Sequence, residues 1–398
     1  LAGLSARPGE RIGDGFGLEA PETVPLMSVQ VEPTAPLTQS ALLAHLREME
    51  EEDPLLSVRP EADGVSVGVM GAVQVEVLQG ILAARFGDVV RMCPPHVLYK
   101  ETIAAPVVGI GHYEPLRHYA EVWLKLEPGA PGSGISFEAD CPPNSLDENW
   151  QRLIRTHVFE RAHPGVLTGS PLCDVRIRLI AGRAHLKHTE GGDFREATCR
   201  AIRNALMQAE NVLLEPVVRF ELAMPNEALA RVTGELLRIG AQLDASETDG
   251  GETTLTGRCT AAMFWDYPTR FAASTRGHGR IASRFDRYEP CKNQDDVVRQ
   301  IGYDPLADTL NPPGSVFCSH GAGYLVKWDE VPAHAHVASG LGRNAPGAQQ
   351  AKQEEADASD EASDARRRAA AYCGTLEQDK ELLAIFERTY GPIKRRGE

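Results

Sequence analysis

Two stretches of the chain, 26–93 and 217–288, follow the same order of elements, and this repetition constrains the fold more than any other feature. In the first stretch, Val65, Val67 and Val69 alternate with smaller or polar residues, which is the period of a half-buried strand. Further strands are expected at 27–31, 55–58 and 88–92. Two groups of apolar residues recur at helical spacing between them: Leu42, Leu43, Leu46 and Met49, then Val73, Val77, Leu78, Ile81 and Leu82.

The second stretch repeats this β-α-β-β-α-β order. Strands are expected at 218–222, 242–245, 252–256 and 280–285. A helical stripe is expected at Leu229, Val232, Leu236 and Ile239. A second helix spans 261–274, with Pro268 either in its first turn or at a break. Both stretches predict a split βαβ, ferredoxin-like domain, in which two helices cover one face of a four-stranded antiparallel sheet.

The region between the two repeats, about 105–215, predicts a different domain. Apolar residues alternate with polar ones along 120–126 and again along 175–179, which indicates two strands. Helices are expected at Leu146–Arg161 and at Phe194–Glu210, the second after an N-cap at Asp193. The whole chain is therefore expected to be an α+β protein.

Bulk properties exclude several protein classes. The 398 residues are 42% hydrophobic and include no apolar run near the ~20 residues needed to cross a bilayer. The first residues lack the charged and apolar regions of a signal peptide, and they read as the middle of a domain, so a truncated chain is expected. The eight cysteines are scattered singly without a CxxC pair, which fits a reducing cytosol. A cytoplasmic monomer without membrane contact is expected.

Motifs for catalysis are missing from the sequence. It contains neither a GxxxxGK[ST] phosphate loop nor an NKxD-type guanine loop, and neither a GxSxG elbow nor an HExxH pair. The glycine cluster at 13–17 lacks a lysine and reads as a turn. No catalytic or cofactor-binding residue is therefore expected. Cys318 and His320 with His334 and His336 offer metal-type ligands, but a buried cysteine and loop histidines are the favoured interpretation, so no metal is expected.

Basic side chains are clustered although the formal net charge is −15. One cluster begins at the end of the last predicted helix of the second repeat and includes the Thr275–Gly279 turn. Another surrounds the strand at 175–179 and the loop after it. Such clusters suit contact with a phosphate backbone, whereas a solvated sheet face is the alternative. The residues are Arg270, Arg276, His278, Arg280, Arg284 and Arg287, then Arg176, Arg178, Arg183 and Lys187.

Four segments in this order resemble the translational GTPase family of elongation factor G. Val69–Leu78 resembles the GMGELHLE segment of domain III. Pro106–Phe137 is similar to the start of domain IV, Val212–Pro216 to the junction into domain V, and Thr275–Gly279 to the TxGRG turn of domain V. The resemblance implies a left-handed βαβ, ribosomal S5-like fold for domain IV. It also implies the ribosome, both RNA and proteins, as partner, with domain IV reaching the decoding region.

The resemblance divides the chain into parts. It assigns 1–22 to the end of β-barrel domain II, 23–104 to domain III, 105–215 to domain IV and 216–290 to domain V. A tail, 291–336, is expected to pack on domains IV and V through its apolar residues Val316, Phe317, Tyr324, Leu325 and Trp328. An acidic linker at 337–364 and a helix at 365–398 complete the chain. GTP and Mg²⁺ are expected only in an N-terminal domain that precedes this sequence, so no catalysis is expected from the chain itself.

Within the family the chain looks closer to the tetracycline-resistance ribosomal protection proteins, because it has a short domain IV opening and an appended tail. Their domain IV tip reads Tyr-Ser-Pro-Val-Ser-Thr-Pro, whereas the matching stretch here is His185 to Gly192, followed by Asp193-Phe-Arg195. This glycine-hinged tip is expected to contact the ribosome through His185, Lys187, His188, Thr189, Glu190, Gly191 and Gly192. In domain V the expected contacts are Arg270, Arg276, His278, Arg280 and Arg284.

Two other interpretations stay open at this stage. The protein is an elongation factor G-like paralogue that does not act on tetracycline, or it is a free-standing RNA-binding module. Single-strand readers with ferredoxin-like sheets stack bases on exposed aromatic side chains. The candidate strands supply only Phe220 and Phe285, and alternation places both inside, which counts against the RNA-binding module.

Overall fold

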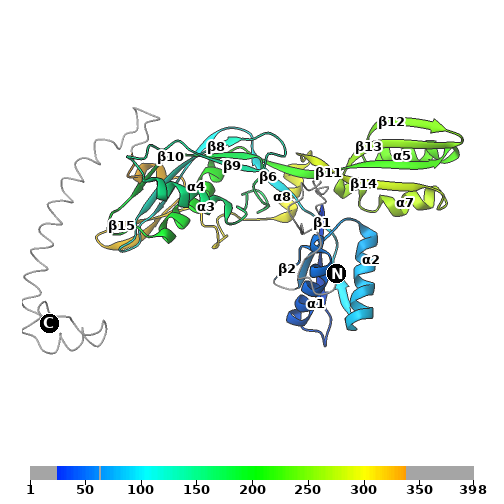
Figure 1. Cartoon of the computed structure of the whole chain (residues 1–398), viewed down its shortest axis with the longest axis horizontal. Helices are drawn as coiled ribbons and strands as arrows, with labels where there is room; N and C mark the ends of the chain where they lie inside the picture. Colours follow the sequence, from blue (N-terminus) through cyan, green and yellow to red (C-terminus); the bar gives the residue numbers. More distant parts are fainter. Residues whose placement is uncertain (1–24, 62–63, 338–398) are drawn as a thin grey trace, which may run out of the picture. The chain divides into compact units, whose positions relative to one another are not determined.

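The computed structural model describes residues 25–61 and 64–337 (Figure 1). The expected barrel end at 1–22 and C-terminal helix at 365–398, and all but the first residue of the acidic linker at 337–364, lie outside the described residues. The chain divides after Val331 into two compact units, and the fold below is that of the first. Within the described ranges, no helix is both long and apolar enough to cross a membrane.

The first repeat forms the expected ferredoxin-like sheet, with strand order β2-β3-β1-β4. Leu42, Leu46 and Met49 of the first helix are buried against it because they recur on one helical face. A short strand, β5 (His96–Val97), adds to β1. The elements are β1 (Met27–Pro33), α1 (Gln39–Glu52), β2 (Arg59–Pro60), β3 (Val65–Val69), α2 (Ala72–Ile81) and β4 (Val90–Met92).

Two expectations for this repeat are wrong. The segment 55–58 is not a strand, because Pro54–Leu56 forms a 3₁₀ turn capped by the Asp53 side chain, and the strand starts at Arg59. The apolar stripe of α2 is also not one buried face. Leu78 is buried, whereas Val73 and Val77 are 57% and 53% exposed. The helix carries apolar residues on two sides, so periodicity alone did not identify the inward side.

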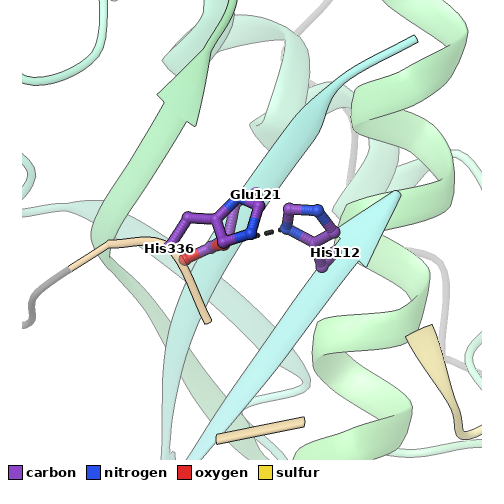
Figure 2. Close-up of side chains that lie close together, drawn as sticks. All are labelled: His112, Glu121 and His336. Atoms are coloured by element: carbon purple, nitrogen blue, oxygen red, sulfur yellow. Dashed lines mark hydrogen bonds and ion pairs between the residues drawn. The ribbon is translucent and has the colours of Figure 1, made fainter. Parts of the chain in front are cut away.

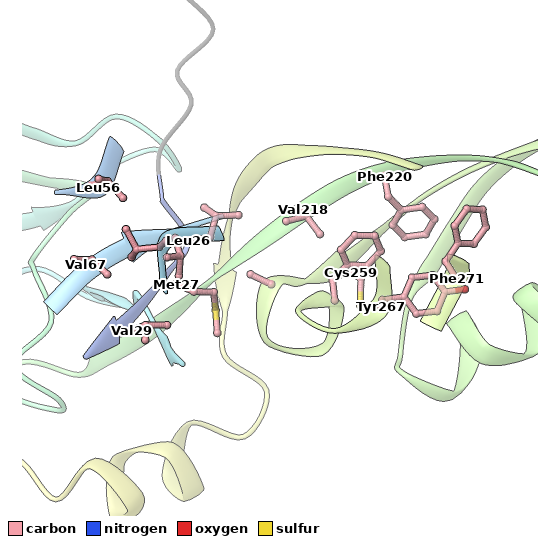
Figure 3. Close-up of a cluster of buried hydrophobic side chains, with 14 of the residues drawn as sticks. Leu26, Met27, Val29, Leu56, Val67, Val218, Phe220, Cys259, Tyr267 and Phe271 are labelled. Atoms are coloured by element: carbon pink, nitrogen blue, oxygen red, sulfur yellow. The ribbon is translucent and has the colours of Figure 1, made fainter. Parts of the chain in front are cut away.

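The second repeat forms the other ferredoxin-like sheet, with order β12-β13-β11-β14. The helix expected at 261–274 is broken at residues 265 and 266 into two short helices, and Pro268 lies in the first turn of the second one. Figure 3 shows Phe220, Cys259, Tyr267 and Phe271 in the buried cluster. The elements are β11 (Asn211–Pro225), α5 (Leu229–Arg238), β12 (Gln242–Asp249), β13 (Glu252–Thr260), α6 (Ala261–Phe264), α7 (Tyr267–Ser274) and β14 (Arg280–Pro290).

The middle region is built on a six-stranded sheet, with order β16-β15-β7-β8-β10-β9. Strands β9 and β10 pair in parallel, and α3 lies in the connection between them, which makes a βαβ unit. The long helix α4 lies against β7 and β8. The elements are β7 (Val107–Tyr113), β8 (Ala120–Pro128), β9 (Ile135–Ala139), α3 (Glu148–Phe159), β10 (Val175–Ala184) and α4 (Gly191–Gln208). A further strand, β6 (Lys100–Ile103), pairs with the start of β11.

The tail after β14 supplies the two edge strands of this middle sheet. It starts with α8 (Gln294–Ile301), and its β15 (Ser315–Ser319) and β16 (Ala322–Val326) form a hairpin that joins β7 at Tyr113. Three polar residues of α4 hold the tail. Arg200 donates to the Gly314 carbonyl at 2.6 Å and Asn204 to the Trp328 carbonyl at 2.7 Å. Arg203 donates to the Tyr303 hydroxyl at 2.7 Å.

The apolar residues expected to anchor the tail are only partly buried. Phe317 is 2% exposed, and Val316 and Trp328 are half-buried, as expected. Tyr324 and Leu325 are 41% and 67% exposed, so the expectation that they pack inside is wrong. They lie on β16, the outermost strand of the sheet, where no further strand of the described residues covers them.

Candidate nucleic-acid interface

The loop between β10 and α4, residues 185–190, is a closed turn held by hydrogen bonds. The Thr189 hydroxyl donates to the Tyr119 carbonyl at 2.6 Å and accepts the His185 amide at 2.6 Å. The amide of Thr189 also donates to the His185 carbonyl at 3.1 Å. The His185 and His188 rings stack with their centroids 4.5 Å apart. The loop therefore presents its outer side chains from a fixed backbone.

The expected glycine hinge is wrong, and so is the expected N-cap. Gly191 and Gly192 form the first turn of α4, and neither has a positive φ. The N-cap is Glu190, and Asp193 is the third helical residue of a capping box, accepting the Glu190 amide at 2.8 Å. The same carboxylate pairs with His118 at 2.8 Å. Helix formation thus removes the flexibility that two adjacent glycines suggested.

The outer side chains of this loop are apolar and basic. Leu186 is fully exposed, and His185, Lys187 and His188 are exposed beside it. Thr189 faces partly inward because its hydroxyl closes the turn. An exposed lysine and two imidazoles around an exposed leucine suit contact with phosphate groups and with unstacked bases.

Beneath the loops at this end of the sheet lies a buried imidazole, His112 on β7 (Figure 2). Its Nδ1 lies 2.8 Å from Glu121 on β8 and its Nε2 lies 3.1 Å from Glu114. Burial opposes protonation of His112, but the hydrogen bonds with Glu114 and Glu121 outweigh it and raise the pKa of the ring. Figure 2 also draws His336, which belongs to the second unit.

The raised pKa of His112 predicts a pH-dependent contribution to stability. The protonated ring stabilises the fold fully below its unfolded pKa of about 6.5, and this contribution is lost as the pH rises through the higher folded value. We expect the difference in free energy of unfolding between the protein and a His112→Gln variant to shrink as the pH rises above 7. Urea denaturation at a series of pH values measures it. A difference that grows with pH would contradict the assignment.

The five basic side chains expected in domain V come from three elements. Arg270 lies on α7, where its guanidinium is 5.7 Å from the Tyr267 ring centroid. Arg276 and His278 are exposed in the turn, and Arg276 has a φ of 53° in the left-handed region. Arg280 and Arg284 lie on β14. The turn therefore projects a guanidinium and an imidazole away from the domain.

The ion pairs of these residues determine which basic side chains could contact a phosphate group without breaking an existing pair. Arg280 is paired with the exposed Glu252 at 2.9 Å, and Arg270 lies 4.0 Å from Asp266, so both guanidinium groups already have a carboxylate partner. Within the described residues, Arg276, His278 and Arg284 have no carboxylate within ion-pair distance. In the basic cluster around β10, Arg178 is surrounded by Glu127, Glu138 and Asp140.

The structure also shows an arginine row that the sequence analysis missed. Arg219 on β11 lies directly opposite Arg258 on β13 and opposite Arg284 on β14. Like charges in direct cross-strand register are unfavourable unless they are neutralised. Asp244 lies 2.8 Å from Arg258 and 3.9 Å from Arg219. The register of three strands creates the row, and the sequence spacing alone gives no signal of it.

The geometry of the described residues bears on two alternatives, a single-stranded RNA-binding module and a metal site. Phe220 is 1% exposed and Phe285 is half-buried, so neither offers the sheet-face aromatic platform of a single-strand reader. Within the described residues, Cys318 and His320 belong to no group of three or more metal-ligating side chains. Instead, His320 Nδ1 lies 2.9 Å from the Ser319 hydroxyl. The expectation that these cysteine and histidine residues bind no metal stays a prediction.

Two family models match the chain, and a solved structure shares its fold. Residues 95–210 match the model described as elongation factor G, domain IV, and residues 212–297 match elongation factor G C-terminus. A crystal structure of a protein from Thermus thermophilus aligns with a TM-score of 0.59 and 25% sequence identity. The alignment covers 70% of this chain and 43% of that chain, so the chain spans less than half the length of this structural relative.

Proposed function

Because the chain belongs to the elongation factor G family of translational GTPases, of which it carries domain IV and the C-terminal domain, we propose that it binds the ribosome through these two domains. The loop at 185–190 contacts ribosomal RNA near the decoding region. The domain V turn contacts RNA phosphates with Arg276 and His278, and Arg284 adds a third charge from β14. The ribosome is thus the partner, and the chain acts by binding.

One observation supports this proposal above the others. The loop exposes Leu186 completely and Lys187 and His188 largely, while hydrogen bonds from its own backbone and from Tyr119 hold it closed. A loop that is already fixed loses little conformational entropy when it binds. The glycine-hinged tip expected from the sequence would have lost more, and the capped start of α4 removes that cost.

The chemical step of the family is proposed to lie outside this chain. The sequence lacks the loops that bind GTP, so GTP and Mg²⁺ are proposed to bind in an N-terminal domain of the complete protein. In this proposal the two domains supply contacts that the nucleotide state of that upstream domain controls.

Cosedimentation with ribosomes at low salt tests the proposal and predicts the effect of Lys187→Ala. Loss of one phosphate contact is expected to weaken binding by about fivefold, equivalent to about 1 kcal/mol. The matched control is Arg152→Ala, which removes an exposed charge of α3 that is already paired with Glu148 at 2.9 Å. The control should bind like the unsubstituted chain. Equal weakening in both variants would mean that bulk charge, not the loop, is responsible.

The finer assignment to tetracycline resistance is a second proposal, and one observation favours it. The tail forms an ordered hairpin on domain IV, and an appended tail is one of the two features that make the chain resemble the tetracycline-resistance members. Expression of the intact gene in a sensitive host should raise the inhibitory concentration of tetracycline. An unchanged threshold with folded protein present would leave the alternative, a paralogue that does not act on the drug.

A further inference from the structure

A cavity of about 80 Å³ lies between α4 and the first part of the tail. Residues of α4 line one part of it, the segment that follows α3 lines a second part, and residues 310–312 of the tail line the third. The family matches end at residues 210 and 297, so the tail residues of the cavity lie outside both. The cavity is therefore a feature that the tail adds to domain IV.

Guanidinium groups dominate the lining of this cavity. Four arginines and two glutamates line it, so positive side chains outnumber negative ones by two, in a chain whose formal net charge is −15. One arginine follows α3, and the other three lie along α4. A concave site with several convergent groups of one charge suits a small ligand of the opposite charge. These residues are Arg161, Arg195, Arg200 and Arg203, with Glu160 and Glu196.

Both glutamates of the lining are already paired with arginines of the lining. Glu160 lies 2.8 Å from Arg195, and Glu196 lies 3.3 Å from Arg200. The remaining buried arginine, Arg203, faces Asp308 at 3.9 Å. A carboxylate beside a guanidinium repels an incoming anion less than a free carboxylate does, because the opposite charge lies close to it. The acidic side chains therefore offset three of the four guanidinium groups.

Arg161 is the fourth guanidinium group, and most of its donors are available. It donates one hydrogen bond, of 2.5 Å, to the side-chain oxygen of Asn311 in the tail. Among the described residues, no carboxylate lies within ion-pair distance of Arg161. A guanidinium group carries five N–H donors in a rigid fork that matches two oxygens of a phosphate. Asn311 thus orients Arg161 while leaving donors for an anion.

The size of the cavity matches one phosphate group. A water molecule needs about 10–15 Å³ of such space, so 80 Å³ holds about five water-sized atoms. A phosphate group has the same number of heavy atoms, whereas a nucleobase has more. A nucleotide could therefore place its phosphate in the cavity but not its base.

We propose that this cavity is a binding site for a phosphate group, with Arg161 as its principal donor. The group belongs either to a small phosphate ester or to the backbone of an RNA, because both present the same oxygens. The bound phosphate contacts α4, the segment after α3 and the tail at once, so it fastens the tail to domain IV. This site does not depend on the proposed ribosome binding.

Titration calorimetry of the full chain with inorganic phosphate tests the proposal, at an ionic strength kept constant with chloride. Arg161→Gln is expected to weaken phosphate binding by about tenfold, because a charge-assisted hydrogen bond is lost. The matched control is Arg155→Gln. It removes an exposed guanidinium of α3 that lies over the Phe159 ring outside the cavity and has no carboxylate partner among the described residues. The control should bind phosphate like the unsubstituted chain.

A second variant tests the cavity without changing its charge. Cys199 on α4 is half-buried and lines the cavity, so Cys199→Met fills part of the space and should abolish phosphate binding. Hydrogen exchange of α4 in this variant checks that the helix is intact. In the unsubstituted chain, phosphate should raise the protection of the amides at 310–314, and it should not do so in Arg161→Gln.

The outcomes also identify the source of the phosphate. An RNA oligonucleotide that displaces inorganic phosphate supports the backbone as the ligand, whereas an RNA that does not displace it supports a small ester. Absence of phosphate binding at millimolar concentration would overturn the proposal, as would equal weakening in Arg161→Gln and Arg155→Gln. Neither result would affect the proposed ribosome binding, because no ribosome is present in the titration.

Discussion

Replacement of Glu101 by alanine is expected to lower the free energy of unfolding of domain IV by about 4 kcal/mol. The Glu101 carboxylate is fully buried. Its oxygens accept the amides of Leu167 and Thr168 at 2.9 Å each and that of Ser170 at 3.2 Å. The Thr168 hydroxyl also donates to it at 2.9 Å. Alanine would leave three backbone donors of the segment between α3 and β10 without their acceptor.

Hydrogen exchange of the amides at 167–170 measures this effect locally, which avoids assuming a single unfolding transition for a chain of several domains. Protection of these amides should be lost in Glu101→Ala. The control Glu138→Ala removes an exposed carboxylate that faces Arg178 at 3.8 Å, and a change below about 1 kcal/mol is expected for it. Equal protection in the two variants would show that Glu101 does not organise the segment.

Replacement of Gly111 by alanine is expected to destabilise the domain by about 3 kcal/mol, because α4 packs directly on the backbone of β7. An added Cβ at Gly111 would lie 1.8 Å from the Ala197 carbonyl oxygen and 2.5 Å from the Ala201 amide. Both are backbone atoms of a helix, so the helix itself would have to move. That movement would also shift the residues of α4 that hold the tail.

A glycine-to-alanine substitution in α2 should instead raise the free energy of unfolding. Gly80 lies in α2, and an added Cβ there would meet no atom within 4 Å. Gly80→Ala should stabilise its helix by about 0.5–1 kcal/mol, because alanine loses less backbone entropy. Hydrogen exchange of the amides of α4 and of α2 measures each effect within its own domain. Unchanged stability of α4 in Gly111→Ala would refute the close packing of α4 on β7, and destabilisation by Gly80→Ala would refute only the open space around Gly80.

The sequence predicted the two ferredoxin-like sheets because their strands alternate clearly and their helices recur at 3.6 residues. Val65, Val67 and Val69 are all fully buried, as that alternation required. Apolar periodicity does not identify the buried side of α2, where Val73 is exposed and Leu78 is buried. The prediction from sequence was also wrong at Gly191, where a capping box imposes helical structure on a glycine pair.

Other features depend on contacts between distant residues and could not be read from local patterns. Glu101 holds the Leu167 amide across 66 positions, and the His112 amide bonds Ser315 across 203 positions. The opposed arginines 219, 258 and 284 are neighbours only because three strands share a register. The clusters of basic residues are visible in the sequence, but only the structure shows that Arg280 is paired with Glu252.

Ribosome binding through phosphate contacts is tested most directly by the salt dependence of the affinity. Three cations, Lys187, Arg276 and Arg284, are proposed to contact phosphates, so log K should fall against log salt with a slope of about −3 between about 50 and 200 mM. A variant with all three replaced by glutamine should keep its fold and lose most of that slope. Binding that does not change with salt, or a slope that survives the triple substitution, would contradict ribosome recognition by these two domains.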